Sequence, residues 1–201
     1  MTKVCEYYFA PQSPWSYLGH AKLIELAKQY DVRIDIKPVD LPKVFSVSGG
    51  LPLAKRPPQR QAYRLIELKR WSEHRNLPLN LHPKFAPTSG DASAKLIIAT
   101  KIAHGTDAAL ALTGSVMHAF WVDEKNIVDA DTLIGLANAA GYDGNALWKS
   151  SETTAIQNEY EQFTNEAIAA SVFGSPWYVI DGESFWGQDR LDFVERAFQK
   201  E

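Results

Sequence analysis

Strand-like sequence is confined to the two ends of this chain, and this feature constrains the fold most. Val4 to Phe9 is rich in β-branched and aromatic residues, and "VRIDIKPVDL" at 32–41 alternates apolar and polar residues with the period of a half-buried strand. Between them, 15–30 repeats apolar residues at helical spacing, with Lys22, Glu25 and Gln29 on the opposite face. The chain therefore opens with a predicted β-α-β unit.

The last thirty residues return to strands. Trp177 to Ile180 reads as a strand, Asp181-Gly182 as a tight turn, and Ser184 to Trp186 as the partner strand, with a helix expected from Gln188 onward. From Gln59 to about Tyr160 the pattern is mostly helical with no convincing strand, whereas the Gly, Ser and Pro density of 42–58 predicts a loop. We expect one α/β sheet domain interrupted by an all-helical one.

Composition and charge narrow the class of function. With 201 residues, 45% of them apolar, and a net charge of −3 without a long basic run, we expect a small organic partner and neither a nucleic acid nor a membrane surface. No signal-peptide pattern or membrane-spanning stretch is apparent, which predicts a cytoplasmic location. The five histidines show no paired spacing, so no metal site is expected, and the lone Cys5 is expected to be buried in the first strand.

Two turns have the residues to bind an anion or a peptide. Ser13 and Pro14 suit the N-cap and first position of a helix, whose N-terminus favours an anion such as a thiolate. Ser13 is either only the cap or also a hydrogen-bond donor to such a thiolate. Pro176 precedes a strand, and it is either an ordinary trans proline or a cis proline that holds the polar backbone groups of Ser175 toward a ligand.

Three segments in this order, "YYFAPQSPWSYL" at 7–18, "YRLIELKRW" at 63–71 and "FGSPWYVIDGESFWGQDRL" at 173–191, together resemble the 2-hydroxychromene-2-carboxylate isomerase family. That family is related to the kappa-class glutathione transferases and, more distantly, to the thioredoxin-fold disulfide oxidoreductases. The resemblance implies a thioredoxin-like domain formed by residues 1–40 plus 170–201. Residues 41–169 would then be the inserted helical domain.

The resemblance also implies a site. Ser13 and Ser16 occupy the two cysteine positions of the oxidoreductases and cannot exchange disulfides, so the thiol would come from bound glutathione, with the catalytic Ser13 hydrogen-bonded to its sulfur. Arg60 matches a family lysine that reaches a carboxylate, and Lys55 is a candidate substitute for an asparagine missing from "GGLPLAKRPP". The residues matched to glutathione binding are Ser175, Pro176 as a cis proline, Gln188, Asp189, Arg60 and Lys55.

The implied activity is a glutathione-dependent cis–trans isomerisation. It would interconvert 2-hydroxychromene-2-carboxylate and trans-o-hydroxybenzylidenepyruvate, as in bacterial naphthalene catabolism, or act on a related small aromatic carboxylic acid. The family resemblance also implies a homodimer. A kappa-type transferase acting on another electrophile and a non-catalytic thioredoxin-fold binding protein stay open. Trp15, Tyr17 and Trp121 either line the substrate pocket or pack in the core.

Overall fold

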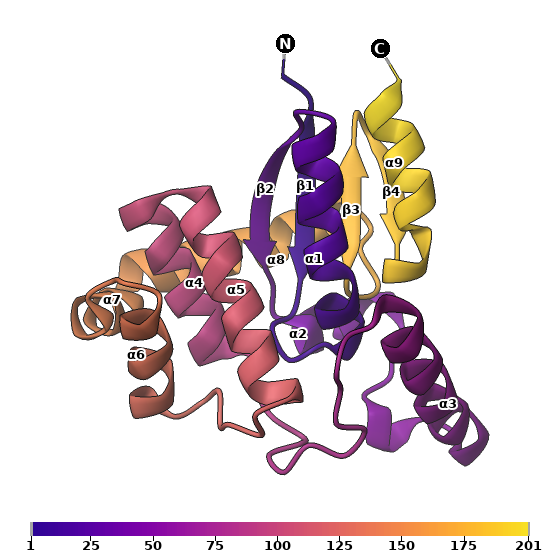
Figure 1. The fold of residues 1–201 in the computed structure, drawn as a ribbon, viewed down its shortest axis with the longest axis horizontal. Helices are drawn as coiled ribbons and strands as arrows, with labels where there is room; N and C mark the ends of the chain where they lie inside the picture. The colour runs from indigo at the N-terminus through magenta and orange to yellow at the C-terminus, as the bar shows by residue number, and fades with distance from the viewer. Residues whose placement is uncertain (1, 201) are drawn as a thin grey trace.

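The two ends of the chain form one mixed sheet (Figure 1). A computed structural model describes residues 2–200, and the order of its strands is β2-β1-β3-β4. The strand bounds are β1 Val4–Phe9, β2 Arg33–Pro38, β3 Trp177–Ile180 and β4 Glu183–Trp186. β1 pairs with β2 in parallel and with β3 antiparallel, and β3 pairs antiparallel with β4. The predicted β-α-β opening and hairpin ending are confirmed.

Helices fill the chain between β2 and β3, and two further helices lie between β1 and β2 and after β4. The helices are α1 Pro14–Gln29, α2 Leu41–Ser48, α3 Pro58–Arg75, α4 Asp91–His104, α5 Thr106–Trp121, α6 Ala130–Ala139, α7 Gly144–Ser151, α8 Thr154–Ala169 and α9 Leu191–Gln199, with 3₁₀ turns η1 Leu53–Lys55 and η2 Gln188–Arg190. This confirms the predicted α/β fold with an all-helical insertion, while the domain boundaries at 40 and 170 stay a prediction. In residues 2–200 no helix combines the length and apolar character that crossing a bilayer demands.

Two local predictions are wrong. Residues 42–58 are not only a loop, because α2 forms at their start. Asp40 caps this helix by accepting a hydrogen bond from Lys43 N–H at 3.1 Å, and Gly49 ends it with φ of +76°. The final helix begins at Leu191 and not at Gln188, because the 3₁₀ turn η2 comes first.

One face of the sheet packs against α1 and α9, which lie in front of it in Figure 1. Cys5, Tyr7 and Phe9 are fully buried there, and the Tyr7 ring stacks on Phe9 at 4.6 Å and on Tyr178 at 5.6 Å between centroids. The buried Cys5 thiol has a pKa raised by desolvation and by the nearby Glu6 carboxylate. Cys5 is therefore a core residue, as the sequence predicts.

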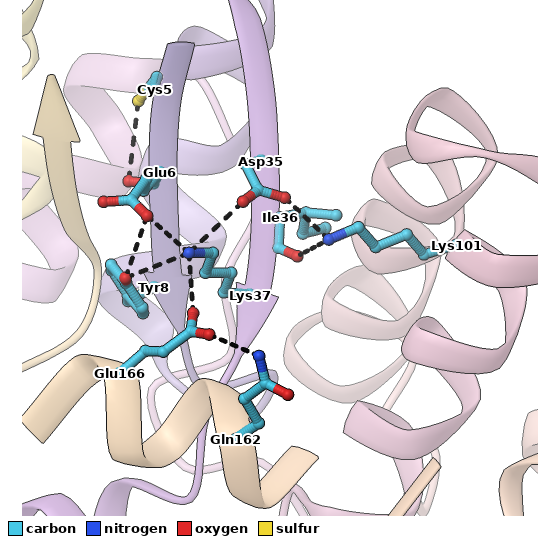
Figure 2. A network of polar contacts seen from close by, with 9 residues as sticks. All are labelled: Cys5, Glu6, Tyr8, Asp35, Ile36, Lys37, Lys101, Gln162 and Glu166. Atoms are coloured by element: carbon cyan, nitrogen blue, oxygen red, sulfur yellow. Dashed lines mark hydrogen bonds and ion pairs between the residues drawn. The ribbon is translucent and has the colours of Figure 1, made fainter. Parts of the chain in front are cut away.

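The opposite face of the sheet is charged and faces α8 (Figure 2). Lys37, which is only 7% exposed, donates from Nζ to Glu6 at 2.6 Å and to Glu166 of α8 at 2.9 Å, and it lies 3.4 Å from Asp35. Asp35 also accepts from Lys101 of α4 at 2.8 Å. Ion pairs therefore connect β1 and β2 to two helices of the insertion.

The pKa shifts in this ionic network follow from its geometry. Burial alone would lower the pKa of the Lys37 ammonium, but hydrogen bonds to Glu6 and Glu166 raise it above its ordinary value. Burial would likewise raise the pKa of Asp35, but Lys101 and Lys37 hold it below the ordinary value. Lys37 and Asp35 are thus both charged at neutral pH.

Candidate active site

Helix α1 begins at the turn formed by Ser13 to Ser16. Ser13 is the N-cap, since its Oγ accepts a hydrogen bond from Ser16 N–H at 3.3 Å, and Pro14 is the first helical residue. The same Oγ donates to the Ser175 carbonyl at 3.3 Å. The capping role of Ser13 is confirmed, and its hydroxyl also contacts the segment that leads into β3.

Ser175 is held in place by its own side chain. Its Oγ accepts from Ala10 N–H at 2.9 Å and lies 2.8 Å from Ser16 Oγ, and the peptide bond to Pro176 is cis. The backbone N–H of Ser175 has no hydrogen-bond partner within residues 2–200. This N–H is available to pair with an extended peptide ligand.

A chain of buried polar contacts runs from Tyr7 of β1 through His20 of α1 to α5. The Tyr7 hydroxyl lies 3.4 Å from His20 Nδ1, and His20 Nε2 donates to the Leu110 carbonyl of α5 at 2.9 Å. Burial lowers the pKa of His20 to about 4, so the ring is neutral at pH 7. Because Nε2 carries the proton toward Leu110, Nδ1 accepts from Tyr7. His20 thus connects α1 to α5 and is only 5% exposed.

The turn before α9 lies beside Pro176. Gly187, with φ of +101°, donates its N–H to the Pro176 carbonyl at 2.9 Å. Gln188 follows and is 1% exposed, while the Asp189 carboxylate is 41% exposed and pairs with Arg190 at 2.9 Å. The structure therefore brings Ser13, Ser175, Pro176 and the Gln188–Asp189 turn together.

Arg75, at the end of α3, is a site residue that sequence reasoning missed. Its Nη2 donates to the Gln188 carbonyl at 3.2 Å and to Gln188 Oε1 at 3.4 Å, and its guanidinium lies over the Trp71 ring at 5.4 Å. Nothing in the sequence around Arg75 signals this contact, because it depends on how α3 packs beside η2. The helix packing therefore adds a cation to the predicted site.

Arg60 and Lys55 are exposed and make no contact with the serine turn. Within residues 2–200, no hydrogen bond or ion pair joins either side chain to Ser13, Ser175 or Asp189. Arg60 lies about 22 Å along the α3 axis from Arg75, at about 1.5 Å per residue. Their assignment to glutathione stays a prediction from the resemblance.

The three aromatic residues predicted near the substrate have limited exposure. Trp15 is half-buried against the core, Tyr17 donates from its hydroxyl to the Pro78 carbonyl at 2.8 Å, and Trp121 is 3% exposed. Trp121 also accepts at its carbonyl from Asn80 N–H at 2.8 Å. Tyr17 and Trp121 therefore meet the same loop from α1 and α5, and their contact with a substrate stays a prediction.

Five side-chain polar atoms are buried without a hydrogen-bond partner within residues 2–200. Beside Trp121 Nε1 and Oε1 of Gln12, the residue directly before Ser13, they are Arg75 Nε, Trp177 Nε1 and the Tyr178 hydroxyl oxygen. Gln12 lies against Gly90, where a Cβ would collide with its carboxamide. In the same residues, no group of three or more His, Cys, Asp or Glu side chains has an arrangement that holds a metal ion.

Comparison with known proteins agrees with this geometry. Residues 4–199 match the family model of the DsbA-like thioredoxin domain. The 2-hydroxychromene-2-carboxylate isomerase of Sphingobium xenophagum is 32% identical over 97% of both chains, and the glutathione S-transferase kappa 2 of Caenorhabditis elegans is 25% identical over 98% of this chain and 94% of its own. A solved 2-hydroxychromene-2-carboxylate isomerase superposes with a TM-score of 0.80 at 26% identity, covering 96% of this chain and 93% of that one.

These matches span nearly the whole chain and include the serine turn, the Ser175–Pro176 segment and the turn before α9. They confirm the thioredoxin-like fold and the family that the sequence motifs indicate. The chain belongs to the family of DsbA-like thioredoxin domains and, within it, to the 2-hydroxychromene-2-carboxylate isomerases, a family of enzymes.

Proposed function

We propose that this protein is a glutathione-dependent isomerase that interconverts 2-hydroxychromene-2-carboxylate and trans-o-hydroxybenzylidenepyruvate or a related aromatic acid. The observation that carries the proposal is the contact between Ser13 and Ser175 at the N-terminus of α1, where the oxidoreductases of this fold place cysteines. The 32% identity to an enzyme named for this reaction supports it. A cytoplasmic homodimer in naphthalene catabolism belongs to the same proposal.

The donor groups of the site fit glutathione. The Ser175 N–H is free to pair with a peptide backbone, and the Asp189 carboxylate is exposed enough to receive an ammonium group. The first turn of α1 offers backbone N–H groups and the positive end of the helix dipole to an anion. The similarity to a kappa-class glutathione transferase adds support for this cofactor.

Each residue then has a defined task. Ser13 can turn its O–H from the Ser175 carbonyl toward a thiolate, since a 3.3 Å hydrogen bond is long and weak. Ser175 and Pro176 align the tripeptide, Asp189 holds its ammonium, and Arg60 or Lys55 meets a carboxylate. When bound, glutathione supplies a thiolate that adds reversibly to a conjugated double bond and so permits rotation about it.

Turnover of a chromene carboxylate with and without glutathione tests the proposal. Wild type should require glutathione and leave the amount of thiol unchanged. Ser13→Ala should lower the rate constant about 10-fold to 100-fold, as expected for a hydrogen bond to a charged group, and should cost about 1 kcal/mol of stability as a lost cap. Ser150→Ala on the exposed end of α7 is the matched control.

The outcomes separate the alternatives. Glutathione consumed together with the substrate would indicate a kappa-type transferase, and glutathione binding without turnover of any electrophile would indicate a binding protein. A Ser13→Ala variant that loses thermal stability but keeps full activity would show that Ser13 is only a cap. Each of these results would overturn the isomerase or the role given to Ser13.

A further inference from the structure

The second serine of the turn, Ser16, has no task in the function proposed above. It is the third residue of α1 and is fully buried, so it has no surface to offer a ligand. Its N–H donates to Ser13 Oγ at 3.3 Å, and its Oγ lies 2.8 Å from Ser175 Oγ. Ser16 therefore contacts, from the interior, both serines that are proposed to meet glutathione.

Ser175 depends on interior contacts for its position. Its Oγ accepts from Ala10 N–H at 2.9 Å and meets Ser16 Oγ, and its carbonyl accepts from Ser13 Oγ at 3.3 Å. Its backbone N–H has no hydrogen-bond partner within residues 2–200. The side chain thus anchors this residue inside the fold, while the backbone N–H stays available to a ligand. Ser16 is one of the two groups that hold this side chain.

Tyr7 and His20 extend the contact of Ser16 into the core. Burial and the Cys5 thiol raise the pKa of the Tyr7 phenol, while a hydrogen bond with the Ser16 side chain opposes this rise. The Tyr7 hydroxyl lies 3.4 Å from His20 Nδ1, and His20 Nε2 lies 2.9 Å from the Leu110 carbonyl of α5. Ser16, Tyr7 and His20 are each at most 5% exposed. A chain of hydrogen bonds therefore leads from the serine turn to α5.

The neutral His20 ring fixes the direction of donation along this chain. Its Nε2–H donates to the Leu110 carbonyl, so Nδ1 accepts the single proton of the Tyr7 hydroxyl. Tyr7 then accepts from Ser16, whose oxygen is left to accept from the Ser175 hydroxyl at 2.8 Å. Each hydroxyl donates once in the same direction, and hydrogen bonds in such a chain strengthen one another. The hydroxyl proton of Ser175 is thereby turned into the core.

We propose that Ser16, supported by Tyr7 and His20, is a positioning residue that orients Ser175 for pairing with the cysteinyl segment of glutathione. Ser13 acts on the sulfur and Ser16 on the alignment of the peptide, so the two serines of the turn have separate roles. A binding group needs such support, because hydrogen bonds from behind lock its geometry. The inference rests on the function proposed above, since it names how the protein aligns the same cofactor.

Calorimetric titration of wild type and Ser16→Ala with two tripeptides tests the inference. They are glutathione and its analogue methylated on the cysteinyl nitrogen, which lacks the N–H that strand-like pairing uses. Wild type should bind glutathione about 10-fold or more tightly than the analogue, and Ser16→Ala should lower that preference about 2-fold to 10-fold by weakening glutathione alone. The ultraviolet thiolate midpoint of the glutathione complex should stay as in wild type, because Ser13 is retained.

The matched control is Ser151→Ala. Ser151 is a buried serine of α7 whose hydroxyl donates to the Trp148 carbonyl at 2.6 Å, so this change also removes a buried hydroxyl but lies outside the chain. It should keep the full preference for glutathione. The control separates a loss of alignment at Ser175 from a general loss of stability.

The chain also predicts coupling between its members. Tyr7→Phe keeps the ring but removes the acceptor of the Ser16 proton, so it should weaken glutathione binding in the same direction. Adding Tyr7→Phe to Ser16→Ala should have little further effect, because both changes break the same chain. Additive effects on the affinity would overturn the role given to Tyr7 and His20.

Other outcomes overturn the inference or the function separately. If Ser16→Ala weakens both tripeptides equally, or neither, Ser16 does not align the peptide and the inference is overturned. If wild type binds glutathione and the methylated analogue equally, the inference fails while the proposed function stands. If wild type binds neither tripeptide, both fail. Should Ser16→Ala not fold, Tyr7→Phe decides the question, since a preference that it leaves unchanged would overturn the inference.

Discussion

Replacing Lys37 with methionine should destabilise the fold strongly at neutral pH. Lys37 is 7% exposed and is the cation shared by Glu6 at 2.6 Å and Glu166 at 2.9 Å (Figure 2). Methionine has a similar length but no charge, so Glu6 and Glu166 would keep only neutral donors, Tyr8 and Gln162, and would lack a cation. Asp35 would keep Lys101 at 2.8 Å.

The free energy of unfolding should fall by about 3 kcal/mol at pH 7. This is the lower end of the range for removing one partner of a buried ion pair, because Glu6 and Glu166 each keep about a third of their side-chain surface exposed. The cost should depend on pH. Burial would raise the pKa values of Asp35 and Glu166, but hydrogen bonds, which Lys37 helps to provide, hold both below the ordinary value. These ionised groups therefore stabilise the native state above about pH 4, and this contribution disappears as the pH falls through their native pKa values.

Urea unfolding of wild type and Lys37→Met at about pH 7 and about pH 4 measures both effects. The difference in unfolding free energy should be about 3 kcal/mol at the higher pH and should shrink at the lower one. Lys149→Met on the exposed face of α7 is the control and should change little. A loss below about 1 kcal/mol at pH 7, or a loss independent of pH, would refute the reasoning.

Two substitutions and one pH titration test other contacts. A Cβ at Gly19 would lie 2.8 Å from Gln188 Cβ, so Gly19→Ala should displace η2. Glutathione should then bind about 10-fold more weakly, and an unchanged affinity measured by calorimetry would contradict this. A Cβ at Gly174 would lie 2.7 Å from Trp186 Cε2, so Gly174→Ala should cost about 1–3 kcal/mol in urea unfolding, and a neutral substitution would show that the indole moves freely. Because burial lowers the pKa of His20 to about 4, the NMR signal of its ring should stay constant between about pH 5.5 and about pH 8. The native state should lose stability through this histidine as the pH falls below about 6.5, where the unfolded chain takes up a proton. A titration midpoint near 6.5 would contradict the assignment.

The sheet could be predicted from the sequence because its signals are local. The β-branched and aromatic residues of Val4–Phe9 and the Asp181-Gly182 turn, with φ of +50° and +81°, specify strands and a hairpin without reference to the rest of the chain. The sequence pattern does not reveal helix α2, because the Gly, Ser and Pro content of residues 42–58 resembles that of a loop. The Asp40 cap and the left-handed Gly49 instead mark the two ends of a short helix.

The site could be predicted only in part. Ser13 and Pro14 carry their own signal as a helix cap, and the family resemblance led to Ser175, Pro176 and Asp189. Arg75 carries no such signal, because its partner Gln188 is far away in sequence and the contact arises from tertiary packing. Buried polar groups such as these are recognised once their partners are known.

The central claim is that Ser13 and the N-terminus of α1 stabilise the thiolate of bound glutathione. A pH titration of the ultraviolet thiolate absorbance of the glutathione complex, in wild type and in Ser13→Ala, tests this most directly. In wild type the midpoint should lie at least about one pH unit below the ordinary thiol value of about 8.5, and in Ser13→Ala it should move back toward that value. A midpoint that equals that of free glutathione, or that is the same in both proteins, would contradict the account.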